Sequence, residues 1–201
     1  MTASRSEVEV ERKWLLRGLP KRLVGTIGPE FTRIHIRQGY LSPVSPEDPA
    51  WDAAREATPD DVPVVGRIRS IDGSRGRSYL HTLKSGSGLV RHEFERPLSE
   101  SAFEAAWPST RGRRLEKTRW RIVEDGVCWE IDRILGLDIV LLEAEIPTVE
   151  AARGIEVPGW LGEVVEREVT DEPTFTNAEM AFRSGFDDAM ERKKRLSDEN
   201  R

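Results

Sequence analysis

The chain has 201 residues, 33% of them charged, and a net charge of −5 at pH 7. This length fits one domain with a substantial hydrophobic core, and the acidic balance argues against a general nucleic-acid-binding surface. The single cysteine, Cys128, excludes an internal disulfide and a cysteine-based zinc site.

Alternation of apolar and polar residues predicts eight β-strands along the chain. Between them, "KSGSGL" and "EDGV" are typical of hairpin turns, because Gly and Asp-Gly tolerate left-handed backbone angles. Consecutive hairpins predict an antiparallel sheet, and eight strands are enough to close a barrel. The fold class we expect is mainly β (α+β), an eight-stranded antiparallel tunnel with flanking helices. The predicted strands cover residues 7–16, 31–41, 63–71, 77–85, 89–98, 114–123, 127–135 and 138–146.

Short helices separate or follow these strands. "SESAFEAAWP" places Ser101 and Glu104 at capping-box spacing. "TVEAARG" offers Thr148 as an N-cap and Gly154 as a terminator. A last helix is predicted from about Asn177 into a basic, frayed C-terminal tail.

The domain prediction is a single unit over residues 1–201, with a core of about 5–190. Residues 42–63 are rich in proline and in acidic side chains, which predicts a long insertion between two strands. No apolar stretch is long enough to span a bilayer and Met1 opens no signal-peptide pattern. We therefore expect a cytoplasmic protein that has no membrane or nucleic-acid partner and is a monomer or homodimer.

Nearly every predicted strand carries ionised groups on one face and apolar groups on the other. Acids gather on the first strand and the last two, and bases on the third and sixth. The charged faces either point outward around an apolar core or point inward to line a hydrated tunnel. Buried charges are costly unless they are paired or bind ions, so an inward arrangement suits a polyanionic ligand that carries metal. Carboxylates favour Mg²⁺ or Mn²⁺, and Arg and Lys favour phosphate, which together indicate phosphoryl transfer.

Several segments resemble the CYTH superfamily, the triphosphate tunnel metalloenzymes. "EVERKW" contains Glu9-x-Glu11-x-Lys13, the ExExK signature of that family. "IRQGYL", "RIR", "TLKSGSGLVRHEFE", "EKTRW", "WEIDR" and "LLEAEI" follow in the order of the family's strands, and "WLGEVVEREVT" continues the match. The resemblance implies an eight-stranded tunnel that holds a triphosphate and requires a divalent metal, Mg²⁺ or Mn²⁺.

The resemblance also implies roles for individual residues. The implied metal ligands are Glu9, Glu11, Glu95, Asp132, Glu143 and Glu145. The implied triphosphate-binding residues are Lys13, Arg67, Arg69, Lys84, Arg91, Lys117 and Arg119. Tyr40 and Lys117 resemble a pair that assists the hydrolytic step, whereas Arg121 and Glu130 are expected to pair with each other at a tunnel mouth.

The activity we expect is hydrolysis of inorganic triphosphate, a small-molecule substrate, to pyrophosphate and phosphate. The alternatives are a thiamine or nucleoside triphosphatase, a class IV adenylyl cyclase, and a non-catalytic module that binds polyphosphate or nucleotide. An ordinary barrel with charged outer faces is a further alternative. Two departures from the family stand out: the long 42–63 insertion, and the absence of lysines beside Asn177.

Overall fold

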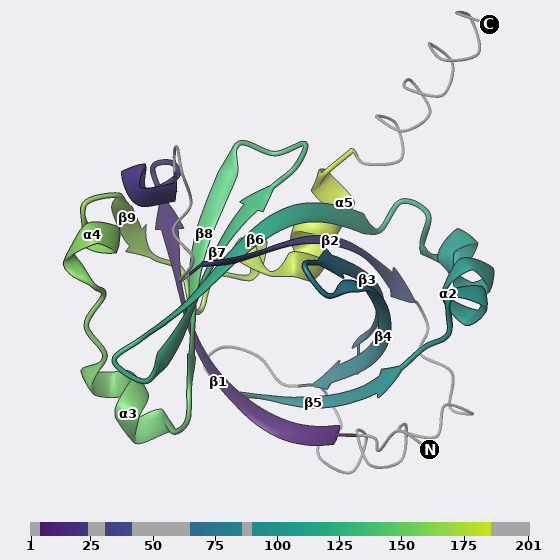
Figure 1. Ribbon diagram of the computed structural model, residues 1–201, viewed down its shortest axis with the longest axis horizontal. Helices are drawn as coiled ribbons and strands as arrows, with labels where there is room; N and C mark the ends of the chain where they lie inside the picture. Colours follow the sequence, from purple (N-terminus) through teal and green to yellow (C-terminus); the bar gives the residue numbers. More distant parts are fainter. Residues whose placement is uncertain (1–4, 24–30, 42–64, 86–89, 186–201) are drawn as a thin grey trace, which may run out of the picture.

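The computed structural model describes residues 5–23, 31–41, 65–85 and 90–185, and within them the side chains of 5–9, 65, 84–85 and 90–92 are outside the description. The described chain forms one antiparallel sheet with short helices at its edges and outer side (Figure 1). The strands are β1 (Arg5–Leu16), β2 (Thr32–Leu41), β3 (Val65–Gly73), β4 (Gly76–Ser85), β5 (Val90–Pro97), β6 (Arg114–Glu124), β7 (Val127–Ile134), β8 (Ile139–Ile146) and β9 (Val165–Glu168). The helices are η1 (Lys21–Leu23), α2 (Glu100–Ala106), η2 (Trp107–Thr110), α3 (Val149–Gly154), α4 (Gly159–Gly162), η3 (Pro173–Phe175) and α5 (Asn177–Arg183).

The strand order is β5-β4-β3-β2-β6-β7-β8-β1-β9, with an additional pairing between β5 and β1. β1 is therefore shared: its first half pairs with β5 from Arg5 to Val10, and its second half pairs with β8 from Val10 to Leu16. The mainly β, antiparallel fold with few helices is confirmed. That the eight longer strands close into a tunnel stays a prediction.

All eight predicted strands are present, with ends within a few residues of those expected. In the predicted "EDGV" turn, Asp125 and Gly126 take the left-handed angles that the sequence indicated, with φ of 51° and 76°. The ninth strand, β9, has only four residues and was not predicted. The predicted turn at 86–89 and the 42–63 insertion are outside the described residues.

Two helix predictions need correction. The N-cap of α2 is Ser99, whose hydroxyl accepts from the Ala102 amide, so the predicted capping box of Ser101 and Glu104 is wrong. Ser99 takes this role because it is the last extended residue before the helix. The last helix begins at Asn177 as predicted but ends at Arg183, ahead of Gly185 with a positive φ of 59°. Its predicted basic continuation, residues 186–201, is outside the description.

The larger hydrophobic core lies on one side of β1, β6, β7 and β8. Its residues include Trp14, Trp120, Trp129, Ile131 and Leu142, with the Trp14 and Trp129 ring centroids 6.0 Å apart. Residues from the segment that carries α3 and α4 pack against it, so these helices cover this apolar face. Figure 1 shows α3, α4 and β9 on the side of β1 and β8 away from β3 and β4.

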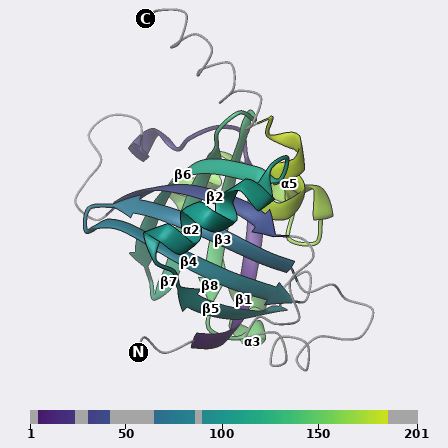
Figure 2. The same cartoon turned by 90° about the vertical axis from the view of Figure 1, so that its right-hand side faces the viewer.

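The outer side of β3 and β4 is covered by α2 (Figure 2). Phe103 of α2 is fully buried, and its ring lies 5.0 Å from that of Tyr79 on β4. Figure 2 shows α2 across the outer side of β3 and β4, with which it is in contact. None of the helices in the described ranges is long and apolar enough to cross a membrane.

A second apolar cluster lies at one end of the sheet's other face. Leu115 and Leu141 belong to it, and each lies two residues from a charged residue of the same strand, Lys117 and Glu143. Residues two apart on a strand share a face, so this cluster and the charged groups lie on the same face. Met180 and Ala181 of α5 pack into the cluster, so α5 covers one end of the charged face.

We predict that Gly39→Ala destabilises the protein. A Cβ at this position of β2 would lie 2.4 Å from the Thr110 hydroxyl, and Thr110 is fully buried and held by Arg114 and by the Trp107 carbonyl. Because neither the β2 backbone nor the bonded Thr110 side chain can shift without losing contacts, the free energy of unfolding should fall by about 1–3 kcal/mol in chemical denaturation. Gly18→Ala is the control, since no atom lies within 4 Å of its added Cβ. Equal stability of the two variants would contradict the close packing of β2 against η2.

Candidate functional site

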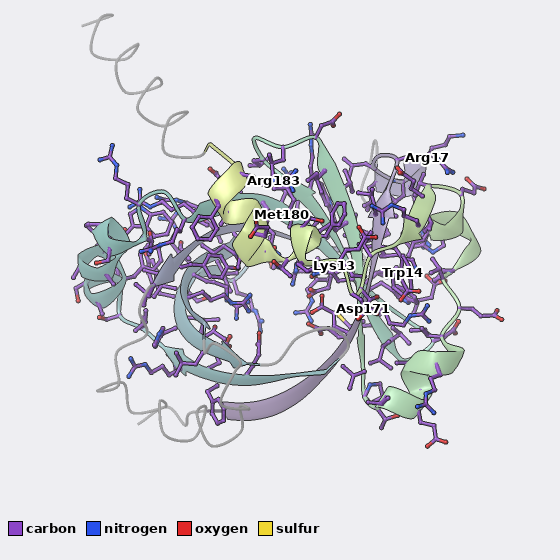
Figure 3. The ribbon with its side chains drawn as sticks, turned by 180° about the vertical axis from the view of Figure 1, so that it is seen from behind. Lys13, Trp14, Arg17, Asp171, Met180 and Arg183 are labelled. Carbon is purple, nitrogen blue, oxygen red and sulfur yellow. The ribbon has the colours of Figure 1, made fainter. Side chains whose placement is uncertain are left out.

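Charged residues of β1, β6, β7 and β8 that share one strand phase meet on the face opposite the large core. Register pairs Glu11 with Glu145 and Lys13 with Glu143 between β1 and β8, and it pairs Arg119 with Asp132 between β6 and β7. Cross-strand partners lie close enough for their side chains to interact. The strand alternation that puts Trp14 into the core therefore puts Lys13 on the charged face (Figure 3).

Lys13 is held between two carboxylates from two strands. Its Nζ lies 3.1 Å from Glu11 Oε1 and 2.9 Å from Glu143 Oε1, and its side chain is 3% exposed. An ammonium group has three donors and must be paired when it is buried. The ExExK lysine is thus a fixed part of the site.

Arg119 is bound by three carboxylates. Its Nε and Nη2 donate to the two oxygens of Asp132 at 2.7 and 2.6 Å, its Nη2 donates to Glu143 at 2.7 Å, and its Nη1 pairs with Glu130. Burial alone would lower the pKa of Arg119, but the carboxylates outweigh it and raise that pKa well above its usual value.

Lys117 shares Asp132 with Arg119. Its Nζ lies 2.6 Å from Asp132 Oδ2, and Asp132 is completely buried. Burial, and secondly the Arg119 charge, lower the pKa of Lys117. Its Nζ also donates to Asn177 Oδ1 at 3.3 Å, so the first residue of α5 reaches the charged face.

Glu143 is the carboxylate that links these groups. Burial would raise its pKa, but Lys13, Lys117 and Arg119 outweigh burial and hold that pKa well below its usual value. Glu143 is therefore ionised and balances several buried positive charges at once.

Arg121 and Glu130 form the predicted pair. Arg121 Nε lies 2.9 Å from Glu130 Oε1, and its Nη2 lies 3.4 Å from Glu145 Oε2. Arg121 and Glu145 have side chains 44% and 45% exposed, whereas that of Glu130 is 3% exposed. Burial raises the pKa of Glu130 to about 7, and Arg119 opposes the shift. Glu130 is thus more than a partner of Arg121, since it also joins the buried network through Arg119.

A second group of charges comes from β3 and β5. Arg67 Nη2 donates to Glu93 Oε1 at 3.0 Å, and both side chains are buried. Arg69 Nη2 pairs with Glu95 and also donates to the Thr82 hydroxyl at 3.3 Å. Arg67 and Arg69, two of the predicted phosphate-binding arginines, are therefore each held by a β5 carboxylate.

Tyr40 lies between the two groups of charges. Its hydroxyl accepts from Gln38 Nε2 at 3.0 Å, and the ring is buried against the second apolar cluster. Burial raises the pKa of Tyr40, while Arg67 and, more weakly, Lys13 oppose the shift. The phenol is therefore protonated near neutral pH.

Three predicted site residues lie at strand positions whose side chains are outside the description. Glu9 and Arg91 are partners in the β1–β5 register, and Lys84 is opposite Glu93 in the β4–β5 register. Of the other predicted residues, those on β1, β6, β7 and β8 lie on the charged face, and Arg67, Arg69 and Glu95 belong to the second group of charges.

The sequence did not identify several polar residues of this face. Gln38 and Thr82 are almost fully buried and bond to Tyr40 and Arg69, respectively. The sequence did carry a signal for them, because Gln38 lies two residues from Tyr40 and Thr82 lies two residues from Lys84, so each shares a strand face with a predicted site residue. The bond of Asn177 to Lys117 depends on how α5 packs against the sheet, which the strand pattern does not indicate.

Comparison with known proteins gives the family. The chain is 34% identical to the inorganic triphosphatase of Nitrosomonas europaea over 177 residues, which cover 87% of this chain and 97% of the relative. The chain belongs to the inorganic triphosphatase family. It is also 31% identical over 108 residues to the inorganic triphosphatase of Acetivibrio thermocellus, covering 52% of this chain and 65% of that protein. No family model matches the chain.

The fold agrees with this membership of the inorganic triphosphatase family. The crystal structure of the inorganic triphosphatase NE1496 superposes with a TM-score of 0.53 at 30% identity, covering 87% of this chain and 94% of that one. The resemblance that the ExExK signature and the later strand segments indicated is therefore confirmed.

The donor set of this triphosphatase-family site fits a divalent cation. Glu11 Oε1 and Glu143 Oε1 come from different strands and converge on the single positive charge of Lys13. Oxygen atoms of carboxylates are the ligands that Mg²⁺ and Mn²⁺ prefer. Cys128, Glu130 and Glu145 form a further group, with one potential ligand atom each and all three atoms within 4.8 Å of one another.

We predict that Glu143→Gln destabilises this triphosphatase-family chain and that Glu145→Gln does not. Glu143 balances several buried cations, so its loss should cost about 3 kcal/mol at pH 7. The exposed Glu145 should change stability by less than about 0.5 kcal/mol. The pKa of Glu143 is depressed in the fold, so its contribution is full above the unfolded value of 4.5 and is lost as pH falls below it. Urea unfolding of both variants across pH 3–7 measures these differences, and a pH-independent Glu143 effect would contradict the assignment.

Proposed function

We propose that this protein hydrolyses inorganic triphosphate to pyrophosphate and phosphate in a reaction that depends on a divalent metal. The observation that carries the proposal is the buried network of both charge signs on one face of the sheet. The relatives at 34% and 31% identity are both named inorganic triphosphatases.

In this proposal the eight longer strands enclose a tunnel around the substrate. The pairing of β1 with β5 through its first half and with β8 through its second half supports such an arrangement, because it joins the two ends of the eight-strand order. The apolar faces are covered from outside by α2, α3 and α4, so the charged faces are left to the interior.

The pairing of the buried charges suits a ligand that carries both signs. Asp132 and Glu143 compensate Lys13, Lys117 and Arg119 in the described structure. A triphosphate offers phosphate oxygens to the cations, and its counterions offer positive charge to the carboxylates. Both sets of buried groups can then exchange an internal partner for a ligand partner without being left unpaired.

A divalent cation, Mg²⁺ or Mn²⁺, would be held by carboxylates of the charged face. The proposed ligands are Glu9, Glu11, Glu95, Asp132, Glu143 and Glu145. Bound there, the cation would neutralise phosphoryl oxygens and activate water.

The remaining residues bind and orient the triphosphate. Arg67 and Arg69 from one wall and Lys13 and Arg119 from the other would bind its oxygens by charge-assisted hydrogen bonds. The proposed set also includes Lys84, Arg91 and Lys117. Such contacts lower the barrier because they stabilise the charge that shifts between phosphoryl groups.

Tyr40 and Lys117 are the proposed catalytic pair. The protonated Tyr40 hydroxyl can donate to a phosphate oxygen, and the lowered pKa of Lys117 eases proton movement at its Nζ. Asn177 and Asp132 orient that Nζ at 3.3 and 2.6 Å.

The test of the activity is phosphate release from inorganic triphosphate, ATP and thiamine triphosphate, each with Mg²⁺, Mn²⁺ or EDTA. We expect turnover of inorganic triphosphate with metal and none with EDTA. Preferred turnover of ATP or thiamine triphosphate would replace the proposed substrate, and cyclic AMP with pyrophosphate would indicate a cyclase. Tight triphosphate binding without release under any metal would indicate a binding module.

We predict that Glu145→Gln abolishes metal-dependent phosphate release while the protein stays folded. Its side chain is 45% exposed, so the change removes a proposed ligand at little structural cost. The rate should fall by at least about 100-fold at saturating Mn²⁺, with an unchanged circular dichroism spectrum. Glu100→Gln, an exposed acid in the first turn of α2, is the control. Full activity of Glu145→Gln would disprove the metal assignment.

A further inference from the structure

One edge of β1 changes partner within the ExExK segment. The pairings with β5 end at Val10, and those with β9 begin at Trp14. Glu11 and Lys13 are therefore at the transition between two partner strands. A backbone segment at such a transition has fewer ladder bonds to fix it, although its side chains must be accurately placed.

The hydroxyl of Thr170 holds the backbone at this transition. Lys13 N donates to Thr170 Oγ1 at 3.0 Å, and Val169 N donates to the Lys13 carbonyl at 2.8 Å. Thr170 lies two residues beyond the end of β9. Its side chain thus supplies, for the Lys13 amide, the bond that a ladder partner would supply in a continued strand.

Thr170 is itself fixed by charges on the outer side of the sheet. Its hydroxyl donates to Glu168 Oε1 at 2.7 Å, and the Glu168 carboxylate accepts hydrogen bonds from Arg12 Nε and Nη2 at 2.9 and 2.5 Å. Arg12 Nη1 donates to the Ala152 carbonyl at 3.1 Å, which ties the network to α3. The bond from Arg12 lowers the pKa of Glu168, so Glu168 is an ionised acceptor for the Thr170 proton.

The network therefore runs from α3 through the β1 backbone to the charged face. Arg12 and Lys13 are neighbours that point to opposite sides of β1: Arg12 lies over the Trp14 ring on the core side, while Lys13 contacts Glu11 and Glu143. Figure 3 labels Lys13 and Trp14 on β1 and Asp171, the residue after Thr170, in the same part of the view, in agreement with the bond from Lys13 N to Thr170.

We propose that Thr170 is a positioning residue for the site: its hydroxyl, oriented by Glu168 and Arg12, fixes the Lys13 backbone and through it the contacts of Lys13 with Glu11 and Glu143. The inference rests on the proposed function, because Lys13 is taken to bind the triphosphate. A small displacement of such a group costs catalysis although no contact with substrate is removed directly.

The test compares Thr170→Val, Thr170→Ser and Thr148→Val. Valine keeps the shape of threonine and removes the hydroxyl, whereas serine keeps the hydroxyl. Thr148→Val is the matched control, because the Thr148 hydroxyl also accepts a backbone amide, that of Ala151 at 3.1 Å, but caps α3 away from Lys13.

The readouts are kcat and KM for inorganic triphosphate with Mn²⁺, the calorimetric Kd of triphosphate in EDTA, and amide hydrogen exchange at Lys13. We expect Thr170→Val to lower kcat/KM about tenfold, weaken the Kd and speed Lys13 exchange. Thr170→Ser should stay within about twofold of wild type, and Thr148→Val should lower only the melting temperature.

Wild-type turnover decides the proposed function, and the ratio of each variant to wild type decides the role of Thr170. Unchanged kcat/KM and Kd in Thr170→Val would overturn the inference. The inference would also be overturned if Thr170→Ser lost as much kcat/KM as Thr170→Val. The same holds if Thr148→Val lost as much kcat/KM as Thr170→Val while the two variants had the same melting temperature. If wild type binds triphosphate but does not cleave it, the function fails and the Kd ratios still decide the positioning role.

Discussion

The arrangement of this site depends on the ion pairs of the Lys13 ammonium group with Glu11 and Glu143. The ammonium group joins β1 to β8 on the charged face, at the place where β1 leaves β5 and meets β9. Burying an ammonium group is costly, so the fold must supply acceptors for it from more than one strand. The register of β1 and β8 supplies them by setting Lys13 opposite Glu143.

The rest of the charged face follows the same rule. Asp132 is completely buried and is matched by Lys117 and Arg119, while Arg67 is matched by Glu93. Each of these buried charges has an opposite charge within reach, and Glu143 and Arg119 connect several pairs into one network. Such a network makes the site stiff, which suits a reaction that depends on positioning and charge stabilisation.

The outer layers serve this face indirectly. The large core behind β1, β6, β7 and β8 keeps these strands in register. Helix α5 covers one end of the charged face with Met180, and its first residue, Asn177, reaches Lys117. Arg12 and Glu168 lie on the outer side, yet they reach the Lys13 backbone through Thr170. Core, helices and site are therefore connected by specific hydrogen bonds as well as by packing.

The sequence by itself determined the eight long strands and which charged residues of a strand share a face, because residues two apart on a strand lie on the same side of the sheet. The ExExK signature and the order of the later segments indicated the family. The sequence could not identify β9, whose four residues carry little alternation, nor choose Ser99 over Ser101 as the cap of α2, since both are serines near the helix start. The tertiary structure alone decided which acid meets which base, as with Arg119 and its three carboxylates, or Thr170 and Lys13. These contacts join residues up to 157 positions apart, and their geometry depends on strand register and helix packing, which no local pattern encodes.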